Sequence, residues 1–313
     1  MILTQMALTL ITSMATPVQA APDHLLTDFD SGGVALRWYS VNDGVMGGRS
    51  SGSFRIEDGQ LLFRGLLNTN GGGFASLRTR TAALDLADRA GIHLRVRGDG
   101  RVYTMRLQQD SGRGRSVSYR AEFRTTEGPE WQDVWLPFGD FVPTWRGRIL
   151  DLPPVDPARV SSIGLMIADK IDGEFQLRVD SIGAFDPFRL PSLRAKQRPL
   201  VIFAPDEDDR RLRRQLSALA TAGDGLRDRE MALIVVLGKG TSVAGTRPLT
   251  ASEVATIRGR FAVAGSDFAV RLVGKDGKTK RSASRPVEVA DLFALVDAMP
   301  MRQAEVAARK GRD

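Results

Sequence analysis

Alternation of apolar and polar residues runs through the first half of the chain and predicts β-strands. Residues 92–97, 103–108 and 175–179 all alternate in this way. A period of two places one face of a strand against a core and the other in solvent. Turn signals separate the runs, at residues 58–59, 98–100, 111–114 and 172–173. Many short strands joined by such turns predict a β-sandwich, an all-β jelly-roll type of fold.

The period changes after a proline-spaced stretch that ends at Pro199. Residues 200–204 and 232–237 are continuous apolar runs, as in strands covered on both faces. Between them, residues 210–226 carry leucines at helical spacing. Together these patterns predict a buried strand, an amphipathic helix and a second buried strand.

The remaining pattern completes a small α/β layer fold. Thr250 and Glu253 have the spacing of a capping box and predict a helix that ends near Phe261. Residues 268–273 and the turn at 275–278 predict a hairpin, and residues 287–299 predict a last helix, extended by the tail. The order β-α-β-α-β-β-α indicates an α/β fold.

These patterns divide the 313 residues into five parts. The length suits two domains of ordinary size. The expected parts are a signal peptide at 1–21, a β-sandwich at 22–187, a linker at 188–197, an α/β domain at 198–299 and a basic tail at 300–313.

The first 21 residues contain no charged side chain and have an apolar middle before small residues at Ala20 and Ala21. This is the shape of a signal peptide, although the basic start of such a peptide is missing. The segment is too short and too rich in Thr and Ser to span a membrane. It predicts a periplasmic or secreted protein, or a cytoplasmic one if the segment is not a signal. No other stretch is apolar enough to span, so we expect no transmembrane segment in the mature chain.

The residue inventory excludes several kinds of chemistry. The chain has no Cys, which removes disulfides, thiolate zinc sites and dithiol redox chemistry. Its only histidines are His24 and His93, too few for a histidine metal site. His93 lies on the polar phase of its strand and is expected to be a surface or cross-strand residue. We expect no metal and no cofactor.

The net charge of +7 is spread unevenly. Residues 22–187 carry 20 basic and 22 acidic groups, a net of −2, whereas residues 188–313 carry 24 and 15, a net of +9. The arginines are scattered and not interleaved with aromatic residues, which favours a solvated surface over a nucleic-acid site. Attraction of the second half to an anionic partner stays open.

Two turns rich in Gly and Asn stand out, at residues 42–48 and 68–73, each beside an aromatic residue and a strand. Such turns suit backbone at positive φ or close approach by a ligand, and they also suit a scaffold that must bend. Trp131 and Trp135 are expected to fill the sandwich, as Trp38 is, and Trp145 is the best candidate for an exposed binding aromatic. The candidate residues for binding a ligand or partner are Trp38, Asn42, Asp43, Met46, Arg49, Asn70, Phe74 and Trp145.

Residues 25–185 resemble the NADH:ubiquinone oxidoreductase intermediate-associated protein 30 family, the complex I assembly factor 1 family. The resemblance rests on Trp38, on the run from Val41 to Ser50 and on the run from Asn70 to Phe74. Further matches follow at residues 136–138, 141, 146–147, 163–165 and 173–175. It implies a galactose-binding-like jelly roll and a role in assembling or holding protein complexes, without catalysis.

Residues 198–299 resemble a bacterial domain family of undetermined function with a thioredoxin-like pattern. The resemblance rests on residues 198–205, 229–232 and 272–277, with Gln215. A thioredoxin-like enzyme would have a dithiol after the first strand, where this chain has Asp206, Glu207, Asp208 and Asp209. These acids favour a solvated helix cap over a calcium loop.

The first hypothesis is therefore a non-catalytic binding and assembly protein, whose partner is a protein, such as a respiratory membrane complex. The alternative is a carbohydrate-binding protein of the bacterial cell envelope, with Trp145 and Asn70 on a glycan. No catalytic residue is assigned, since nothing singles out a pair among the carboxylates Asp43, Glu57, Asp169 and Glu174. No nucleic-acid partner is expected.

Overall fold

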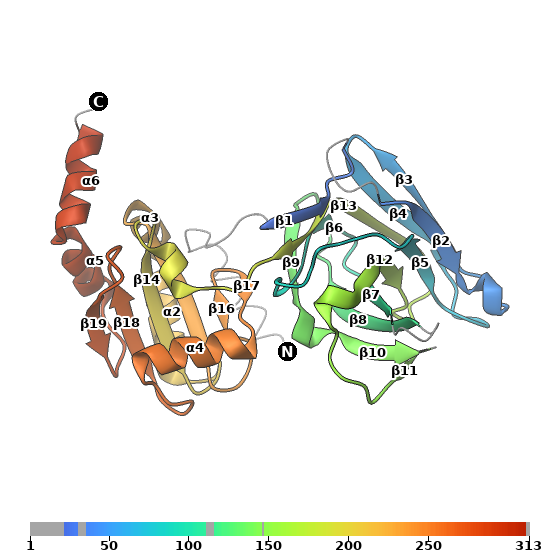
Figure 1. Ribbon diagram of the computed structural model, residues 1–313. Coiled ribbons are helices and arrows are strands. Elements are labelled where there is room, and N and C mark those ends of the chain that lie inside the picture. The colour runs from blue at the N-terminus through green and yellow to red at the C-terminus, as the bar shows by residue number, and fades with distance from the viewer. Residues whose placement is uncertain (1–21, 31–35, 111–115, 146, 311–313) are drawn as a thin grey trace. The chain divides into compact units, whose positions relative to one another are not determined.

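The computed structural model describes residues 22–30, 36–110, 116–145 and 147–310. The chain forms two compact units, with the boundary between Pro187 and Phe188 (Figure 1). No helix in the described ranges has the length and apolar character needed to cross a lipid bilayer.

The first unit is built from two antiparallel sheets that enclose one core. One sheet has the order β3-β4-β13-β6-β9, with β1 paired to β13, and the other has the order β11-β10-β8-β7-β12-β5-β2. The strands are β1 (His24–Thr27), β2 (Trp38–Asn42), β3 (Ser51–Glu57), β4 (Gln60–Leu67), β5 (Ala75–Thr79), β6 (Gly91–Arg97), β7 (Val102–Asp110), β8 (Ser116–Arg124), β9 (Gln132–Pro137), β10 (Val142–Trp145), β11 (Arg148–Ile149), β12 (Val160–Ile167) and β13 (Gly173–Phe185). Short 3-10 turns interrupt them at η1 (Asp43–Met46), η2 (Phe138–Asp140) and η3 (Pro157–Arg159). The predicted β-rich character of this unit is confirmed.

The alternation seen in the sequence produces the core. Leu94 and Leu177 of the six-stranded sheet pack with Met105 and Leu165 of the seven-stranded sheet, and all four are buried. Burying a side chain of this size contributes about 1.5–3 kcal/mol relative to leaving it in water. The strands are therefore held by the core on one face, and their other faces are available for polar residues.

His93 is a cross-strand residue, one of the two positions expected for it, whereas two of the tryptophans expected in the core lie elsewhere. His93 is buried, with its ring centroid 4.1 Å from that of Trp135 across β6 and β9. Trp135 is buried too, but alternation places it on the outer face of its sheet with His93, because Val134 and Leu136 occupy the core. Trp131 is half-buried beneath Arg97, whose guanidinium carbon lies 4.9 Å from its ring centroid. Of the three tryptophans expected in the core, only Trp38 packs against it.

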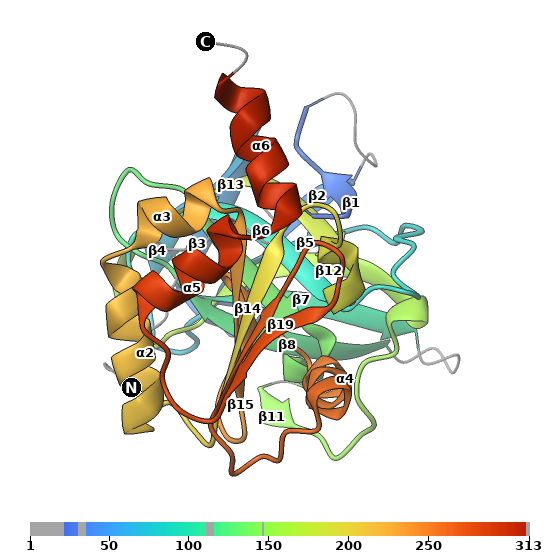
Figure 2. The ribbon, with the colours of Figure 1, turned by 90° about the vertical axis from the view of Figure 1, so that its left-hand side faces the viewer.

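The second unit is a six-stranded sheet with helices on both faces (Figure 2). Its strands, in the order β17-β16-β15-β14-β18-β19, are β14 (Arg198–Ala204), β15 (Met231–Leu237), β16 (Val243–Ala244), β17 (Arg247–Pro248), β18 (Ala269–Val273) and β19 (Thr279–Ala283). Its helices are α2 (Arg210–Ala220), α3 (Gly223–Asp228), α4 (Ala251–Phe261), α5 (Val289–Asp297) and α6 (Pro300–Lys310), with the 3-10 turn η4 (Leu190–Leu193). Strands β14 and β15 are parallel, and all other pairings are antiparallel.

The continuous apolar runs become the central strands, as predicted. Every residue of β14 and β15 is buried, because α2 and α5 pack on one face and α4 and η4 on the other. The predicted capping box of α4 is confirmed: the Thr250 hydroxyl accepts the Glu253 N–H, and the Glu253 carboxylate accepts the Thr250 N–H. The predicted hairpin is also present, as β18 and β19.

Two segments differ from the sequence-based expectation. Residues 210–226 lie in two helices, α2 and α3, which are separated at Thr221 and Ala222, where the backbone at Ala222 leaves the helical conformation. Residues 188–197, expected as a linker, form η4 and bury Leu190 and Leu193 in the core of the second unit. That stretch is therefore part of the α/β unit.

Buried ion pairs fix α6 to this unit. The Arg198 side chain is fully buried, and its Nη2 donates to Oε1 of Glu305 at 2.9 Å. Lys275 Nζ donates to the same oxygen at 2.6 Å. Burial raises the pKa of Glu305, but the hydrogen bonds from Arg198 and Lys275 outweigh it and leave that pKa lowered. A second pairing joins Arg302 of α6 to Asp228.

Glu305→Gln is expected to lower the unfolding free energy of the second unit by about 3 kcal/mol, because it leaves a buried guanidinium without its closest charge partner. The matched control is Glu288→Gln, which breaks an exposed pair with Arg214 at 3.1 Å and is expected to cost at most about 0.5 kcal/mol. All four tryptophans lie in the first unit. Urea unfolding followed by far-ultraviolet circular dichroism, with tryptophan fluorescence as the reference for the first unit, measures the difference. Equal decreases in unfolding free energy in the two variants would contradict a stabilising role for the buried ion pair between Arg198 and Glu305.

Candidate functional site

The two glycine-rich turns meet at one end of the sandwich. The first turn leads from β2 of the seven-stranded sheet into β3 of the six-stranded sheet, and the second leads from β4 back to β5. Since β2 pairs with β5 and β3 pairs with β4, the two crossings lie beside each other. The sequence stretch that stood out is therefore the place where the chain passes twice between the sheets.

The carboxylate of Asp43 ties the two turns together. Its Oδ1 accepts the N–H of Ser50 at 2.9 Å, and its Oδ2 accepts the Ser50 hydroxyl at 2.6 Å. The same Oδ2 accepts the N–H groups of Gly73 at 2.6 Å and Phe74 at 3.3 Å. The Ser50 hydroxyl in turn accepts the N–H of Asn68 at 3.1 Å. One side chain thus satisfies backbone donors from both turns.

Glycines make room for this carboxylate. A Cβ on Gly48 would lie 2.2 Å from Cγ of Asp43, and a Cβ on Gly72 would lie 2.4 Å from its Oδ2. No real Cβ approaches another atom so closely. The glycines at these two positions are therefore needed for the cage around Asp43, which explains them without a ligand.

The electrostatics of Asp43 fit a fixed structural anion. The side chain is fully buried, and burial raises the pKa of a carboxyl group. The hydrogen bonds from Ser50, Gly73 and Phe74 outweigh that effect, so that the pKa of Asp43 is lowered. A permanently ionised, fully bonded carboxylate is a poor general acid or base, since it has no proton to give and no free lone pair directed at a ligand.

The other candidates from the same turns surround this cage. Asn42 donates from Nδ2 to the carbonyl of Gly52 at 3.0 Å, and its buried Oδ1 has no partner among the described residues. Asn70 is exposed, and its N–H donates to Oδ1 of Asn68. Phe74 is half-buried and Arg49 is exposed. The side chain of Met46 lies outside the described part of the structure.

Trp38 and Trp145 are not brought to this end. Trp38 begins β2, whereas the turn follows the last residue of that strand. Trp145 is 56% exposed and lies in β10. Four strand spacings separate β10 from β5, about 19 Å. Trp145 and Asn70 therefore do not form the shared glycan site that the sequence had suggested.

The carboxylates left open as acid–base groups are mostly engaged. Asp169 is buried in an ion pair with Arg101 at 2.7 Å, and Glu57 lies 3.5 Å from Arg178. Glu174 is exposed on β13. In the second unit, Asp209 caps α2 by accepting the N–H groups of Arg211 and Leu212. No group of three or more potential metal-ligating side chains is present within the described ranges.

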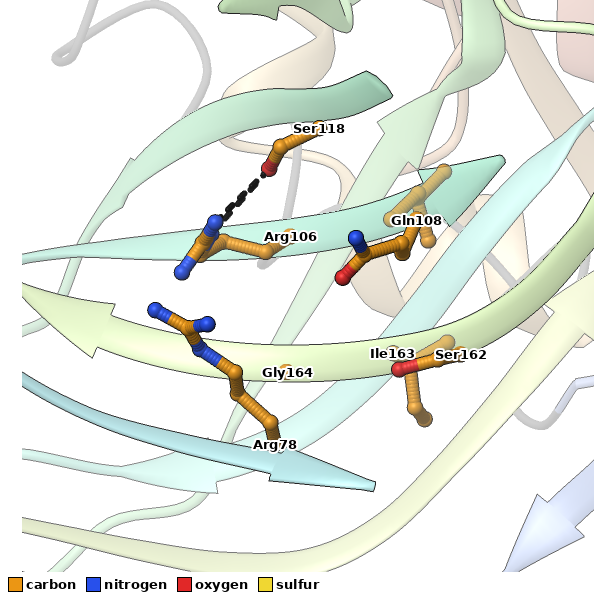
Figure 3. Close-up of a pocket in the computed structure, with 8 residues that line it drawn as sticks. Arg78, Arg106, Gln108, Ser118, Ser162, Ile163 and Gly164 are labelled. Atoms are coloured by element: carbon orange, nitrogen blue, oxygen red, sulfur yellow. Dashed lines mark hydrogen bonds between the residues drawn. The ribbon is translucent and has the colours of Figure 1, made fainter. Parts of the chain in front are cut away.

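A different polar site lies on the outer face of the seven-stranded sheet. Strand register aligns six residues across five neighbouring pairs, in the order Tyr39, Arg78, Gly164, Arg106, Arg120 and Val142. We call the three arginines of this line the arginine row. Gly164 lies between Arg78 and Arg106 in this line and places no side chain between them. Figure 3 shows the guanidinium groups of these two arginines directed toward one another above β12.

A hollow of about 10 Å³ lies along this row. Its lining includes Arg78, Arg106, Gln108, Ser118 and Ser162. The Ser118 hydroxyl accepts from Nε and Nη2 of Arg106 at 3.2 and 2.9 Å. Sequence patterning could not find this site, because each arginine occupies an ordinary polar position of its own strand, and only the register brings them together.

Each unit matches the sequence model of a known protein family. Residues 27–179 match the sequence model of the family described as complex I intermediate-associated protein 30 (CIA30). Residues 189–305 match that of a domain of unknown function (DUF4174).

Several curated relatives align with the first unit. The mitochondrial complex I intermediate-associated protein 30 of Mus musculus is 40% identical over 100 residues, 31% of this chain and 30% of the mouse protein. The Drosophila melanogaster protein of the same name is 30% identical over 184 residues, 51% of this chain and 62% of the fly protein. An uncharacterized protein of Schizosaccharomyces pombe is 30% identical over 166 residues, 46% and 76% of the two chains. The chain thus spans less than a third of the mouse relative and less than two thirds of the fly relative.

Among solved structures, a family 11 carbohydrate-binding module from Clostridium thermocellum, in complex with a β-1,3-1,4-mixed-linked tetrasaccharide, aligns with a TM-score of 0.41 at 17% identity. The alignment covers 54% of this chain and 98% of the module.

Asp43→Asn is expected to lower the unfolding free energy of the first unit by about 2–4 kcal/mol at pH 7, because an amide nitrogen would face buried N–H donors. The lowered pKa gives the sign of the pH dependence. The stabilisation is present above the ordinary carboxyl value of 3.8 and is lost as pH falls through the lower folded value. The unfolding free energies of the variant and the wild type should therefore converge in strong acid. Urea unfolding followed by tryptophan fluorescence between pH 2 and pH 7 measures this.

The control for that experiment is Asp58→Asn, at an exposed position of the β3–β4 turn with a φ of 51°. Asn tolerates this conformation, so its effect should stay within about 0.5 kcal/mol. A wild-type stability that did not fall with acid faster than that of Asp43→Asn would contradict the structural role of the carboxylate.

Proposed function

Since residues 27–179 belong to the complex I intermediate-associated protein 30 family, we propose that this protein is a non-catalytic assembly factor that acts through protein–protein contacts. The partner is a protein component of a membrane complex, in line with the names of the relatives. The second unit provides a further docking surface.

The main support for this proposal is that the glycine-rich turns leave no open pocket around their buried carboxylate. The stretch through which the chain resembles the family encloses Asp43 completely instead of opening a pocket. A rim that is fixed by internal hydrogen bonds can present a constant outer shape to a partner, whereas catalysis needs a group that can change its protonation or bonding.

We also propose a specific fold for each unit. A galactose-binding-like jelly roll is supported by the two antiparallel sheets of the first unit. A thioredoxin-like second unit is supported by the neighbouring order β15-β14-β18-β19, with a parallel first pair, an antiparallel second pair and helices on both faces. At the start of α2, where a thioredoxin-like enzyme would need its dithiol, Asp209 caps the helix. This favours docking over thiol exchange.

Affinity purification from solubilised membranes tests the function. The full tagged chain is expected to retain a defined set of membrane-complex subunits, because the first unit carries the family's features. A chain limited to residues 188–313, shown to be folded by circular dichroism, is expected to lose most of that set. Capture of the same subunits by both chains, or of none by either, would count against the proposal.

Export remains a proposal based on residues 1–21, which lie outside the described residues. We expect the mature protein in the periplasm with a new N-terminus after Ala20 or Ala21. Fractionation followed by N-terminal sequencing measures both. A cytoplasmic protein that retains Met1 would instead favour a partner reached from the cytoplasmic side of the membrane.

A further inference from the structure

The arginine row carries positive charge that no carboxylate among the described residues neutralises by an ion pair. Among the described residues, Arg78, Arg106 and Arg120 form no ion pair with a carboxylate, whereas Arg101 of the same unit is paired with Asp169. Glu122 is the nearest acid along β8 on this face, and it is exposed without a described ion pair to the row. The site is basic although residues 22–187 have a net charge of −2.

Two of these arginines are also partly removed from water. Burial lowers the pKa of Arg106, and the neighbouring charges of Arg78 and Arg120 lower it further, to about 10. Burial lowers the pKa of Arg78 as well, and its Nε is buried without a hydrogen-bond partner in the described structure. Like charges held together in this way destabilise a protein unless an anion balances them. The row lies on the face of the sheet opposite the core.

The size of the hollow sets the size of the group that enters it. A space of about 10 Å³ admits about one water-sized group, far less than the 300–1,000 Å³ of a typical metabolite pocket. One oxygen of an oxyanion can therefore enter the hollow between Arg78 and Arg106, while the rest of the ligand lies across the open sheet. The planar guanidinium fork matches a carboxylate with two parallel hydrogen bonds.

The ends of the row indicate which kind of molecule carries that carboxylate. Tyr39 is 37% exposed at one end, and at the other end Val142 and Ile149 are 39% and 69% exposed. Exposed Tyr and aliphatic side chains around arginines are typical of protein interfaces. The guanidinium carbon of Arg80 lies over the Tyr39 ring, 5.1 Å from its centroid, and Val and Ile have no aromatic face on which a sugar ring could stack. This favours an acidic protein segment over an acidic polysaccharide.

We propose that the arginine row is the docking site for an acidic segment of a protein partner, with one carboxylate between Arg78 and Arg106 and a second at Arg120. This inference rests on the proposed function, because it names the surface through which the first unit binds its partner. Contacts of this type form fast and weaken with salt.

Binding of fluorescein-labelled hexaglutamate to the full chain, measured by fluorescence anisotropy, tests the site. Arg78→Gln and Arg106→Gln are each expected to weaken binding about tenfold, and the double variant more, because each removes a charge-assisted pair. Arg64→Gln, at an exposed position of β4 in the other sheet, is the matched control and should change binding less than about twofold. No binding by the wild type, or equal binding by the double variant, would overturn the proposal.

Three further measurements separate the alternatives. Tetragalacturonate binding that is stronger than hexaglutamate binding and lost in Arg106→Gln would replace the protein partner with an acidic glycan. Inorganic phosphate that displaces hexaglutamate at equal concentration would overturn carboxylate recognition in favour of a general oxyanion site. The melting temperature of Arg106→Gln should be equal to or above that of the wild type, whereas a clear drop would identify a structural arginine.

The membrane purification, repeated with the full-length Arg78→Gln, Arg106→Gln double variant, distinguishes failure of this inference from failure of the proposed function. Loss of the subunits captured by the wild type supports the docking site. Retention of those subunits overturns the site and leaves the assembly function standing. A wild type that captures none of them overturns the assembly function itself.

Discussion

The first unit depends on one buried carboxylate. Two loops must cross between its sheets side by side, and such crossings leave backbone N–H groups that neither sheet can satisfy. Asp43 accepts several of them at once, from Ser50, Gly73 and Phe74. A buried charge is tolerated here because the hydrogen bonds converge on it. Gly48 and Gly72 are a requirement of that geometry, since a side chain at either position would enter the space of the carboxylate.

The second unit also contains a buried charge, but an ion pair compensates it. Arg198 is fully buried there, and Glu305 from the last helix supplies its counter-charge. Lys275 joins the pair, so that strand, hairpin and C-terminal helix are held by one network. The tail is therefore an integral part of this unit, because the central strand would otherwise contain an uncompensated charge.

The arginine row is the exception to this rule of internal compensation. Asp43 accepts converging hydrogen bonds, and Arg198 has the carboxylate of Glu305 as its counter-charge. Among the described residues, Arg78 and Arg106 instead have hydroxyl and amide groups as neighbours. An unbalanced, partly buried charge is what a binding site for an opposite charge requires before the ligand arrives. In a protein related to complex I intermediate-associated proteins, such a site gives the otherwise closed sandwich a surface with a defined chemical preference.

Local patterns in the sequence predict most of the strands and helices and the boundary between the two units. Period-two runs gave the antiparallel sandwich, continuous apolar runs gave β14 and β15, and Thr250 with Glu253 gave the start of α4, because each of these signals is local. The sequence also marked Asn42, Asp43 and the glycines as special. The enclosure of Asp43 and the separation of Trp145 from Asn70 depend on how distant segments pack, which no local pattern contains. Only strand register, which joins residues distant along the chain, placed Arg78 and Arg106 on either side of Gly164.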